Sequence, residues 1–333
     1  MGAEVTTAGA AGGATAEAAA AGATAGAAAA GAGVRAARAH DAGRAYLSML
    51  WGALAFALMG ELGHLAGGWC SWQLVAVART SVALVLSVAI ARAAGVRLVL
   101  FRPATLWIRS VSGSLGILCS FYSLTHLPVS TSLTLSNTVP VWVAVLAWLL
   151  LGYRPTAQIW IAIAAAVAGV ALIQRPHFAG GGLAVAAALA HAFFWAVGVI
   201  GLNRLGEVDP RAVVVHFAVV STVVALAFFL VTGADFGGGR LGDWRLASAL
   251  VGVGLAGTLG QLGMTRAFAL GHPSKVAVVG LTQIVFACVF DLVFWQQRFD
   301  ALTVAGILLV TAPTAWLLLH SPLRRAASVH TTA

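Results

Sequence analysis

The run AVVVHFAVVSTVVALAFFLVT fills residues 212–232 and contains no Asp, Glu, Lys or Arg. A helix rises about 1.5 Å per residue, so this run is long enough to cross the ~30 Å hydrocarbon core of a bilayer. Of the 333 residues in the chain only 9% are charged and 60% are hydrophobic, whereas about 25% of residues are charged in soluble proteins. The sequence therefore predicts an integral membrane protein.

Similar apolar runs recur on both sides of this one, separated by short polar or Gly/Pro breaks. Each is roughly long enough to span a bilayer as a helix. We therefore expect an all-α integral membrane protein with ten transmembrane helices, at residues 46–66, 73–94, 104–125, 128–151, 157–174, 182–203, 212–232, 246–269, 274–296 and 301–320.

The two ends of the chain lack such runs. Residues 1–43 consist almost wholly of Ala, Gly and Thr, which offer no packing face, so we expect a disordered cytoplasmic tail. Residues 321–333 are expected to form a second cytoplasmic tail. The first tail lacks the apolar core and cleavage site of a secretory signal, so the first helix should remain in the mature protein.

Basic residues outnumber acidic ones, with 19 Lys and Arg against 10 Asp and Glu, but they stand singly between apolar runs. This spacing indicates a lipid bilayer and no nucleic acid as the partner. With both termini in the cytoplasm, twelve of the basic residues lie on the cytoplasmic side and four outside, as the positive-inside rule requires. The abundance of Ala, Gly and Arg indicates a bacterial source, so we expect a multi-pass protein of the bacterial inner membrane.

Motifs of enzymes and metal sites are absent from the sequence. The three cysteines have no CxxC spacing, and no HExxH, GxSxG or His box occurs. We therefore expect no catalytic residue, no metal and no cofactor. An intramembrane enzyme and a structural or sensory membrane protein remain as alternatives.

Part of the third predicted helix recurs in the eighth. Gly113-Ser-Leu-Gly116 reappears as Gly257-Thr-Leu-Gly260, and the same shift of 144 residues gives nine identities among the 43 pairs that begin there. Halves of five helices each would be inverted relative to one another across the membrane. Inverted repeats are typical of secondary transporters, in which two halves enclose one site and expose it alternately. A ten-helix protein of another function with the same duplication is the alternative. The expected halves are residues 46–174 and 182–320.

Several short motifs occur in corresponding places of the two halves. They are Phe121-Tyr-Ser-Leu124, Leu127-Pro128, Asn137 to Ala144, Leu151-Gly-Tyr-Arg154 and Gly169-Val170 in the first half, then Arg266 to Leu270, Gln283 to Ala287 and Trp295-Gln-Gln-Arg298 in the second. With these motifs the chain resembles the EamA-type transporters of the drug/metabolite transporter superfamily. The resemblance implies a permease that moves a small organic metabolite or drug-like solute across the cytoplasmic membrane by alternating access, with proton-coupled efflux as one mode.

The chain departs from that family at three places. The family commonly has Gly-Glu-Arg at the end of the fourth and ninth helices, where this chain has Gly152-Tyr-Arg154 and Gln296-Gln-Arg298. A proline expected near Ile284 is also missing. The resemblance therefore does not carry over a substrate or a coupling mechanism.

Polar side chains near the middle of the membrane are costly unless they have a partner, which makes Asn137 and Gln283 candidates for substrate binding or for hydrogen bonds between helices. The resemblance places their helices beside a central cavity. Pro140 leaves the carbonyl of Ser136 without its usual hydrogen bond and so adds an acceptor at that level. Trp142 lies deeper than the interfacial tryptophans and is a further candidate.

His191 and Trp195 are four residues apart and share one face of a helix. An imidazole titrates near neutral pH, and an indole offers a flat surface to an aromatic or cationic group. The pair therefore predicts a cavity wall, with a hydrogen bond from His191 to a neighbouring helix as the alternative.

Charged side chains within a membrane need a partner, water or a function. Glu61 and Asp291 are the acids within the predicted helices; they could exchange a proton, pair with a cationic substrate, or be hydrated near the surface. Among the deeper cations Arg266 is the stronger candidate for an anionic substrate, although it could reach the cytoplasmic face instead. Arg79 could pair with Glu61. Gln261 is a further substrate-binding candidate.

The predicted substrate is a small molecule, for which amino acids, aromatic metabolites, nucleoside- or vitamin-like compounds and hydrophobic drugs are all open. A monomer and a homodimer are both compatible with the sequence. The candidate residues are Asn137, Trp142, His191, Trp195, Gln261, Arg266 and Gln283 for substrate binding, and Glu61 and Asp291 for coupling.

Overall fold

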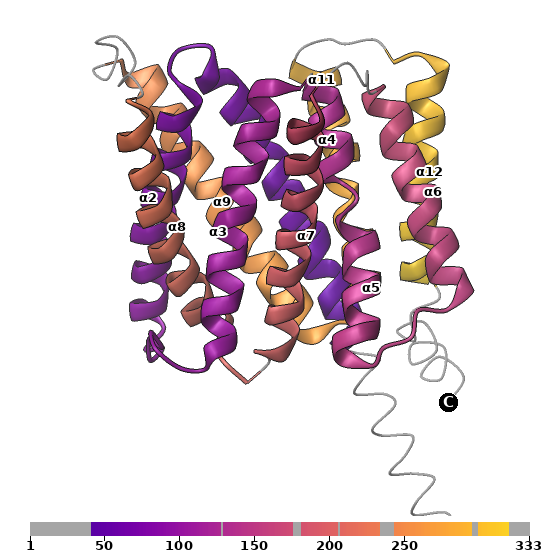
Figure 1. Cartoon of the computed structure of the whole chain (residues 1–333), viewed down its shortest axis with the longest axis horizontal. Helices are drawn as coiled ribbons and strands as arrows, with labels where there is room; N and C mark the ends of the chain where they lie inside the picture. The colour runs from indigo at the N-terminus through magenta and orange to yellow at the C-terminus, as the bar shows by residue number, and fades with distance from the viewer. Residues whose placement is uncertain are drawn as a thin grey trace, which may run out of the picture. The chain divides into compact units, whose positions relative to one another are not determined.

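A computed structural model describes residues 41–127, 129–175, 181–205, 207–233, 243–294 and 299–319 (Figure 1). Almost all of the two predicted tails lies outside the described residues, and so do a few side chains within helices, including that of Asp291. All regular elements that the structure describes are helices. They are an N-terminal helix Asp41–Gly67, α2 Trp72–Ala93, α3 Ala104–His126, α4 Val129–Ser136, α5 Val139–Leu151, α6 Ala157–Gln174, α7 Gly182–Arg204, α8 Pro210–Thr232, α9 Trp244–Leu270, α10 Pro273–Gly280, α11 Thr282–Phe294 and α12 Ala301–Leu319.

The ends of α8 show how local chemistry sets these bounds. Asp209 caps the N-terminus, with its carboxylate accepting the backbone N–H of Arg211 at 2.8 Å, and Pro210 takes the first helical position, where no N–H is needed. Gly233 ends the helix in the left-handed conformation with φ 59°, which favours glycine. The run expected at residues 212–232 therefore forms a helix that begins two residues earlier.

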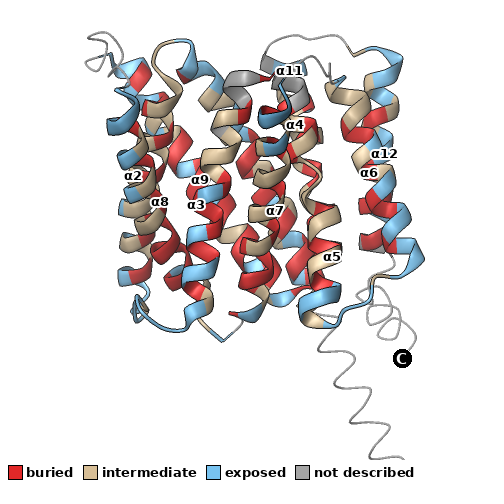
Figure 2. Ribbon diagram, in the orientation of Figure 1, coloured by how far each residue is buried: buried red, intermediate tan, exposed pale blue. Residues whose placement is uncertain are grey.

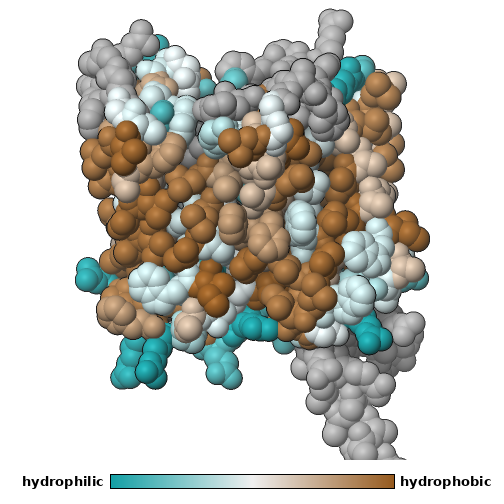
Figure 3. Space-filling view, in the orientation of Figure 1, coloured by the Kyte–Doolittle hydropathy of each residue, from teal (hydrophilic) through white to brown (hydrophobic). Residues whose placement is uncertain are grey.

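In the part of the chain that the structure describes, eight helical segments are long and apolar enough to cross a membrane, and α12 adds a shorter apolar stretch. The helix α3 is also long, but it carries Arg109 and several serines. On the face shown in Figure 3, apolar side chains cover the middle of the bundle, and hydrophilic residues gather toward its two ends. Exposed large residues such as Leu149 and Val231 would be costly in water, so this surface fits a lipid environment.

Two of the helices expected to be continuous are broken. The range 128–151 divides into α4 and α5 at Asn137 and Thr138, and the range 274–296 divides into α10 and α11 at Leu281. Pro140 explains the first break in part, because it lacks an N–H to continue the ladder and lies in the first turn of α5. Both α4 and α10 are eight residues long. Their first residues, 129 and 273, are 144 apart, as are the two Gly-x-Leu-Gly motifs.

Neighbouring helices in the bundle pack in pairs: α3 lies along α7, α2 along α8 and α9, and α6 along α12. Buried residues concentrate between the helices (Figure 2). The pair α6 and α12 is in backbone contact, because a methyl group at Gly169 would lie 2.6 Å from the carbonyl oxygen of Gly306. A methyl group at Gly306 would likewise lie 2.7 Å from the carbonyl oxygen of Gly169. Small residues at this crossing let the two helices approach closely.

Candidate functional site

A cavity of about 330 Å³ lies among the helices. Its walls come from the N-terminal helix and from α2, α3, α4, α5, α7, α9, α10 and α11, and both helix breaks contribute to it through Asn137 and Leu281. Most of the lining is apolar, with a small number of polar side chains. Cavities of this composition hold small organic ligands, whose pockets measure about 300–1,000 Å³. The volume therefore fits a solute at the small end of that range.

His191 and Trp195 form one wall of the cavity from α7. The Nδ1 atom of His191 lies 2.8 Å from the backbone oxygen of Gly116 on α3. A carbonyl oxygen can only accept, so Nδ1 carries the hydrogen, and in the neutral ring Nε2 is left as an acceptor. The two rings stack with centroids 5.9 Å apart and planes at 29°. The structure thus gives His191 both features considered from the sequence, a hydrogen bond to a neighbouring helix and a place on the cavity wall.

The break between α4 and α5 supplies further polar atoms to the cavity. Asn137 donates from Nδ2 to the carbonyl of Leu133 at 2.8 Å, which closes the last turn of α4 and leaves its amide oxygen as an acceptor. The hydroxyl of Ser136 is buried, lines the cavity and has no hydrogen-bond partner among the described residues. Gln283 lines the cavity from α11, beyond the other break.

Three of the remaining candidates lie away from this cavity. Trp142 packs edge-on against Phe193, with ring centroids 5.5 Å apart. Arg266 is exposed on α9 and does not line the cavity. Gln261 is only 5% exposed and borders a separate small hollow between α2, α8 and α9.

Of the two acids proposed for coupling, the structure describes the side chain of Glu61 alone. Glu61 is partly buried in the N-terminal helix and is not a lining residue. Asp291 lies in α11, and its side chain lies outside the described residues. Among the described residues no group of three or more His, Cys, Asp or Glu is placed to hold a metal ion.

Sequence reasoning singled out Arg79 as a deep cation but ranked it below Arg266 for binding an anion, and it missed the methionines as lining residues. Arg79 lies on α2 and lines the cavity. Met49, Met59 and Met264 all line the cavity, and they are the only methionines after Met1. Methionine is flexible and polarizable, and it adapts to ligands of different shape.

A second buried polar cluster lies away from the cavity, between α3 and α8. The hydroxyl of Ser110 lies 2.7 Å from Nδ1 of His216, and Trp107 meets the same imidazole edge-on at 4.7 Å. Beside them the guanidinium carbon of Arg109 lies 4.1 Å from the ring centroid of Phe217. Arg109 is 1% exposed, and its Nε and Nη2 atoms have no hydrogen-bond partner among the described residues. The cation–π contact offsets part of the cost of burying this charge.

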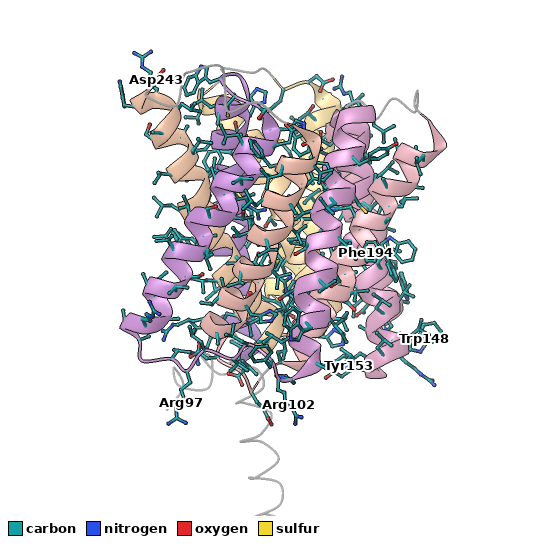
Figure 4. All side chains as sticks on the ribbon, turned by 60° about the vertical axis from the view of Figure 1, so that its left-hand side comes forward. Arg97, Arg102, Trp148, Tyr153, Phe194 and Asp243 are labelled. Atoms are coloured by element: carbon teal, nitrogen blue, oxygen red, sulfur yellow. The ribbon has the colours of Figure 1, made fainter. Side chains whose placement is uncertain are left out.

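At one end of the bundle, contacts join the ends of α5, α7 and α9. Arg204 donates to the carbonyl of Leu150 at 2.6 Å, and the rings of Tyr153 and His272 lie 4.9 Å apart. Burial, and secondarily the nearby charge of Lys275, lower the pKa of His272 below its ordinary value. Arg97 and Arg102 project from the same end as Tyr153, whereas Asp243 lies at the opposite end (Figure 4).

An ion pair joins the C-terminus of α6 to the N-terminus of α12. Arg175 donates to Asp300, and both side chains are about half exposed. Asp300 also accepts the hydroxyl of Thr303 at 2.8 Å and its backbone N–H at 3.1 Å, and so caps α12. These hydrogen bonds from Thr303, together with the contact from Arg175, lower the pKa of Asp300 to about 2.

Known proteins similar to this chain include a transporter family and individual transporters. The model of the EamA-like transporter family matches residues 43–175 and again residues 182–319. The pseudopaline exporter CntI of Pseudomonas aeruginosa strain UCBPP-PA14 is 29% identical over 238 residues, which cover 70% of this chain and 82% of the exporter. Solute carrier family 35 member G1 of the mouse is 26% identical over 231 residues, covering 63% of this chain and 60% of the carrier.

A solved crystal structure shares the fold, with a TM-score of 0.71 at 17% identity, and covers 85% of this chain and 98% of the other. The chain is an apolar helical bundle around a solute-sized cavity, and its relatives include an exporter and a solute carrier. These findings identify it as a membrane transporter. The chain belongs to the EamA-like transporter family, which confirms the resemblance inferred from its motifs.

Proposed function

We propose that this transporter exports a small organic solute through the cavity by alternating access between two inverted five-helix halves. The observation that carries the proposal is the cavity itself, because both helix breaks open onto it. Broken helices around a shared site are the usual binding arrangement of secondary transporters. Export rather than import is supported by the name of the relative that is described as an exporter.

The two segments that match the family model, residues 43–175 and 182–319, support a division of the chain into two halves. The shift of 144 residues between α4 and α10 supports the duplication. Ten crossings result when α3 and α12 are added to the eight apolar spans. An even number places both termini on one side, and the basic residues favour the cytoplasmic side of a bacterial inner membrane.

One chain lines the whole cavity in the described part of the molecule, so a monomer is sufficient for the proposed cycle. His191 is the cavity residue best suited to a coupled proton, because its Nε2 atom is available to the cavity while Nδ1 holds the ring in place. Glu61 is a weaker candidate for coupling, since it is not among the described lining residues.

The test is solute flux in proteoliposomes that contain the purified chain, with and without a proton gradient. We expect saturable movement of at least one class of small solute. His191→Ala and Gln283→Ala should impair it while membrane abundance stays near wild type, and Trp148→Leu on the exposed side of α5 is the matched control. Unimpaired flux in both cavity variants would refute the assignment of the site.

A further inference from the structure

Among the described residues that line the cavity, one carries a formal charge. Arg79 is the only Arg or Lys among its lining residues, and no Asp or Glu lines it in the described part of the chain. The other polar groups at the cavity are amides, hydroxyls and the imidazole of His191. The electrostatic potential inside the cavity is therefore positive, which favours an anionic group and opposes a cationic one.

Arg79 has no hydrogen bond or ion pair with another described residue, although it lies on a helix that crosses the membrane. A guanidinium in such a place needs an acceptor, water or a ligand. Gly257 on α9 makes room for it, because a methyl group there would lie 3.3 Å from Nε of Arg79 and 3.0 Å from the sulfur of Met59. The neighbouring helix thus packs around the guanidinium without supplying an acid.

Arg79 also borders the small hollow that contains Gln261. The hollow measures about 20 Å³, which is enough for one water-sized group. Both polar atoms of the Gln261 amide are buried and have no hydrogen-bond partner among the described residues. The hydroxyls of Thr258 and Ser221, which also border the hollow, donate to carbonyls of their own helices. The hydrogen-bond donors left for a ligand are therefore the guanidinium of Arg79 and the amide nitrogen of Gln261.

We infer that Arg79 and Gln261 form a subsite for the carboxylate of the transported solute, whose remaining part lies against His191 and Trp195. This inference rests on the proposed transport function. An arginine matches a carboxylate because its planar guanidinium donates two parallel hydrogen bonds to the two oxygens. Arg79 borders both the cavity and the small hollow, so one carboxylate oxygen would occupy the hollow, where the amide of Gln261 donates a third hydrogen bond. The transported solutes are then small organic acids with a flat apolar part, and cationic drugs are excluded.

Matched pairs of probes test the subsite by equilibrium binding to the full chain in nanodiscs. The pairs are N-acetyltryptophan with its neutral amide, and 3-phenylpropanoate with its neutral amide. Hydrogen bonds to a charged group predict that each acid binds roughly 10- to 100-fold more tightly than its amide. Arg79→Gln should abolish this preference, and Arg79→Lys should retain part of it. Arg266→Gln removes an exposed arginine of α9 and should leave the preference for the acid over its amide intact.

Gln261→Leu provides a second variant in case Arg79→Gln does not fold. It should weaken binding of the acids and leave binding of the amides unchanged. Equal affinity within each pair, or failure of the acids to bind, overturns the inference. Chloride could also stabilise the wild-type protein but not Arg79→Gln, while acid and amide bind with equal affinity. This result would assign the site to an inorganic anion and would overturn the inference.

Flux measurements separate this inference from the proposed function. Transport of neutral solutes without any preference for acids would leave the transporter standing and remove the carboxylate subsite. Binding of acids that depends on Arg79, in a protein that moves no solute, would establish the subsite and refute transport.

Discussion

Replacement of Gly169 by alanine tests the close contact between α6 and α12. The added methyl group would lie 2.6 Å from the carbonyl oxygen of Gly306, 2.9 Å from Cβ of Leu309 and 2.9 Å from Cγ2 of Val310. Backbone cannot rotate away as a flexible side chain can, so the helices must separate by several tenths of an ångström. Overpacking of this kind costs about 1–3 kcal/mol of unfolding free energy.

Gly63→Ala is the matched control. Gly63 lies within the N-terminal helix, and a methyl group there meets nothing within 4 Å. Alanine favours helix over glycine by about 1 kcal/mol at both positions, so this gain cancels when the two variants are compared. The difference between them isolates the steric cost at the α6–α12 crossing.

The assay is thermal unfolding of the purified variants in one detergent, followed by the loss of monodisperse protein. We expect Gly63→Ala to match or exceed the wild-type midpoint and Gly169→Ala to fall clearly below it. Gly306→Ala should behave like Gly169→Ala, because its methyl group would lie 2.7 Å from the carbonyl oxygen of Gly169. Equal midpoints for Gly169→Ala and Gly63→Ala would show that α6 and α12 do not meet at these glycines.

Three further predictions concern the polar contacts. The pKa of His272 is lowered, so on acidification the unfolded state binds the proton before the folded state does. The contribution of neutral His272 to stability is complete above about pH 6.5 and falls as the pH drops below that value. His272→Gln should therefore show a smaller fall in thermal midpoint between pH 7.5 and 5.5. Asp300 has a depressed pKa of about 2, so its contribution is present at neutral pH and lost on acidification toward that value. The difference in midpoint between wild type and Asp300→Asn should therefore shrink below about pH 4, and a difference that does not change with pH would contradict the assigned cause. Ser110→Ala removes the hydroxyl that bonds Nδ1 of the buried His216 and should lower the free energy of unfolding by about 1–3 kcal/mol. Ser112→Ala loses only a hydrogen bond to its own helix and should lower it clearly less, as measured by chemical denaturation.

The positions of the helices could be predicted from the sequence, because each apolar run ends at a polar, Gly or Pro break that also ends the helix. The break at Asn137 had a partial signal in Pro140. The break at Leu281 also had a partial signal, in Gly280 before it and in the polar residues Thr282 and Gln283 after it. At this break the N–H of Leu281 donates to the carbonyl oxygen of Val278 at 3.1 Å.

The candidate site was harder to predict than the helices. Asn137, His191, Trp195 and Gln283 line the cavity, but Arg266 points away from it and Arg79 takes its place. The rotation of each helix about its own axis decides which of its side chains line the cavity. Because lipid and protein interior are both apolar, these helices have no polar face to indicate which side turns inward. Only the packing of neighbouring helices supplies that information.

The three methionines of the cavity have a consequence for oxidative conditions. A thioether is oxidised to a sulfoxide, which is polar and chiral, whereas the backbone and the helix ends are left unchanged. Oxidation of Met49, Met59 and Met264 would therefore replace three soft apolar contacts by dipoles inside a solute pathway. Because Met49 and Met264 are also buried in the core of the bundle, such oxidation would disturb helix packing as well as the cavity wall, and methionine sulfoxide reductases would reverse it.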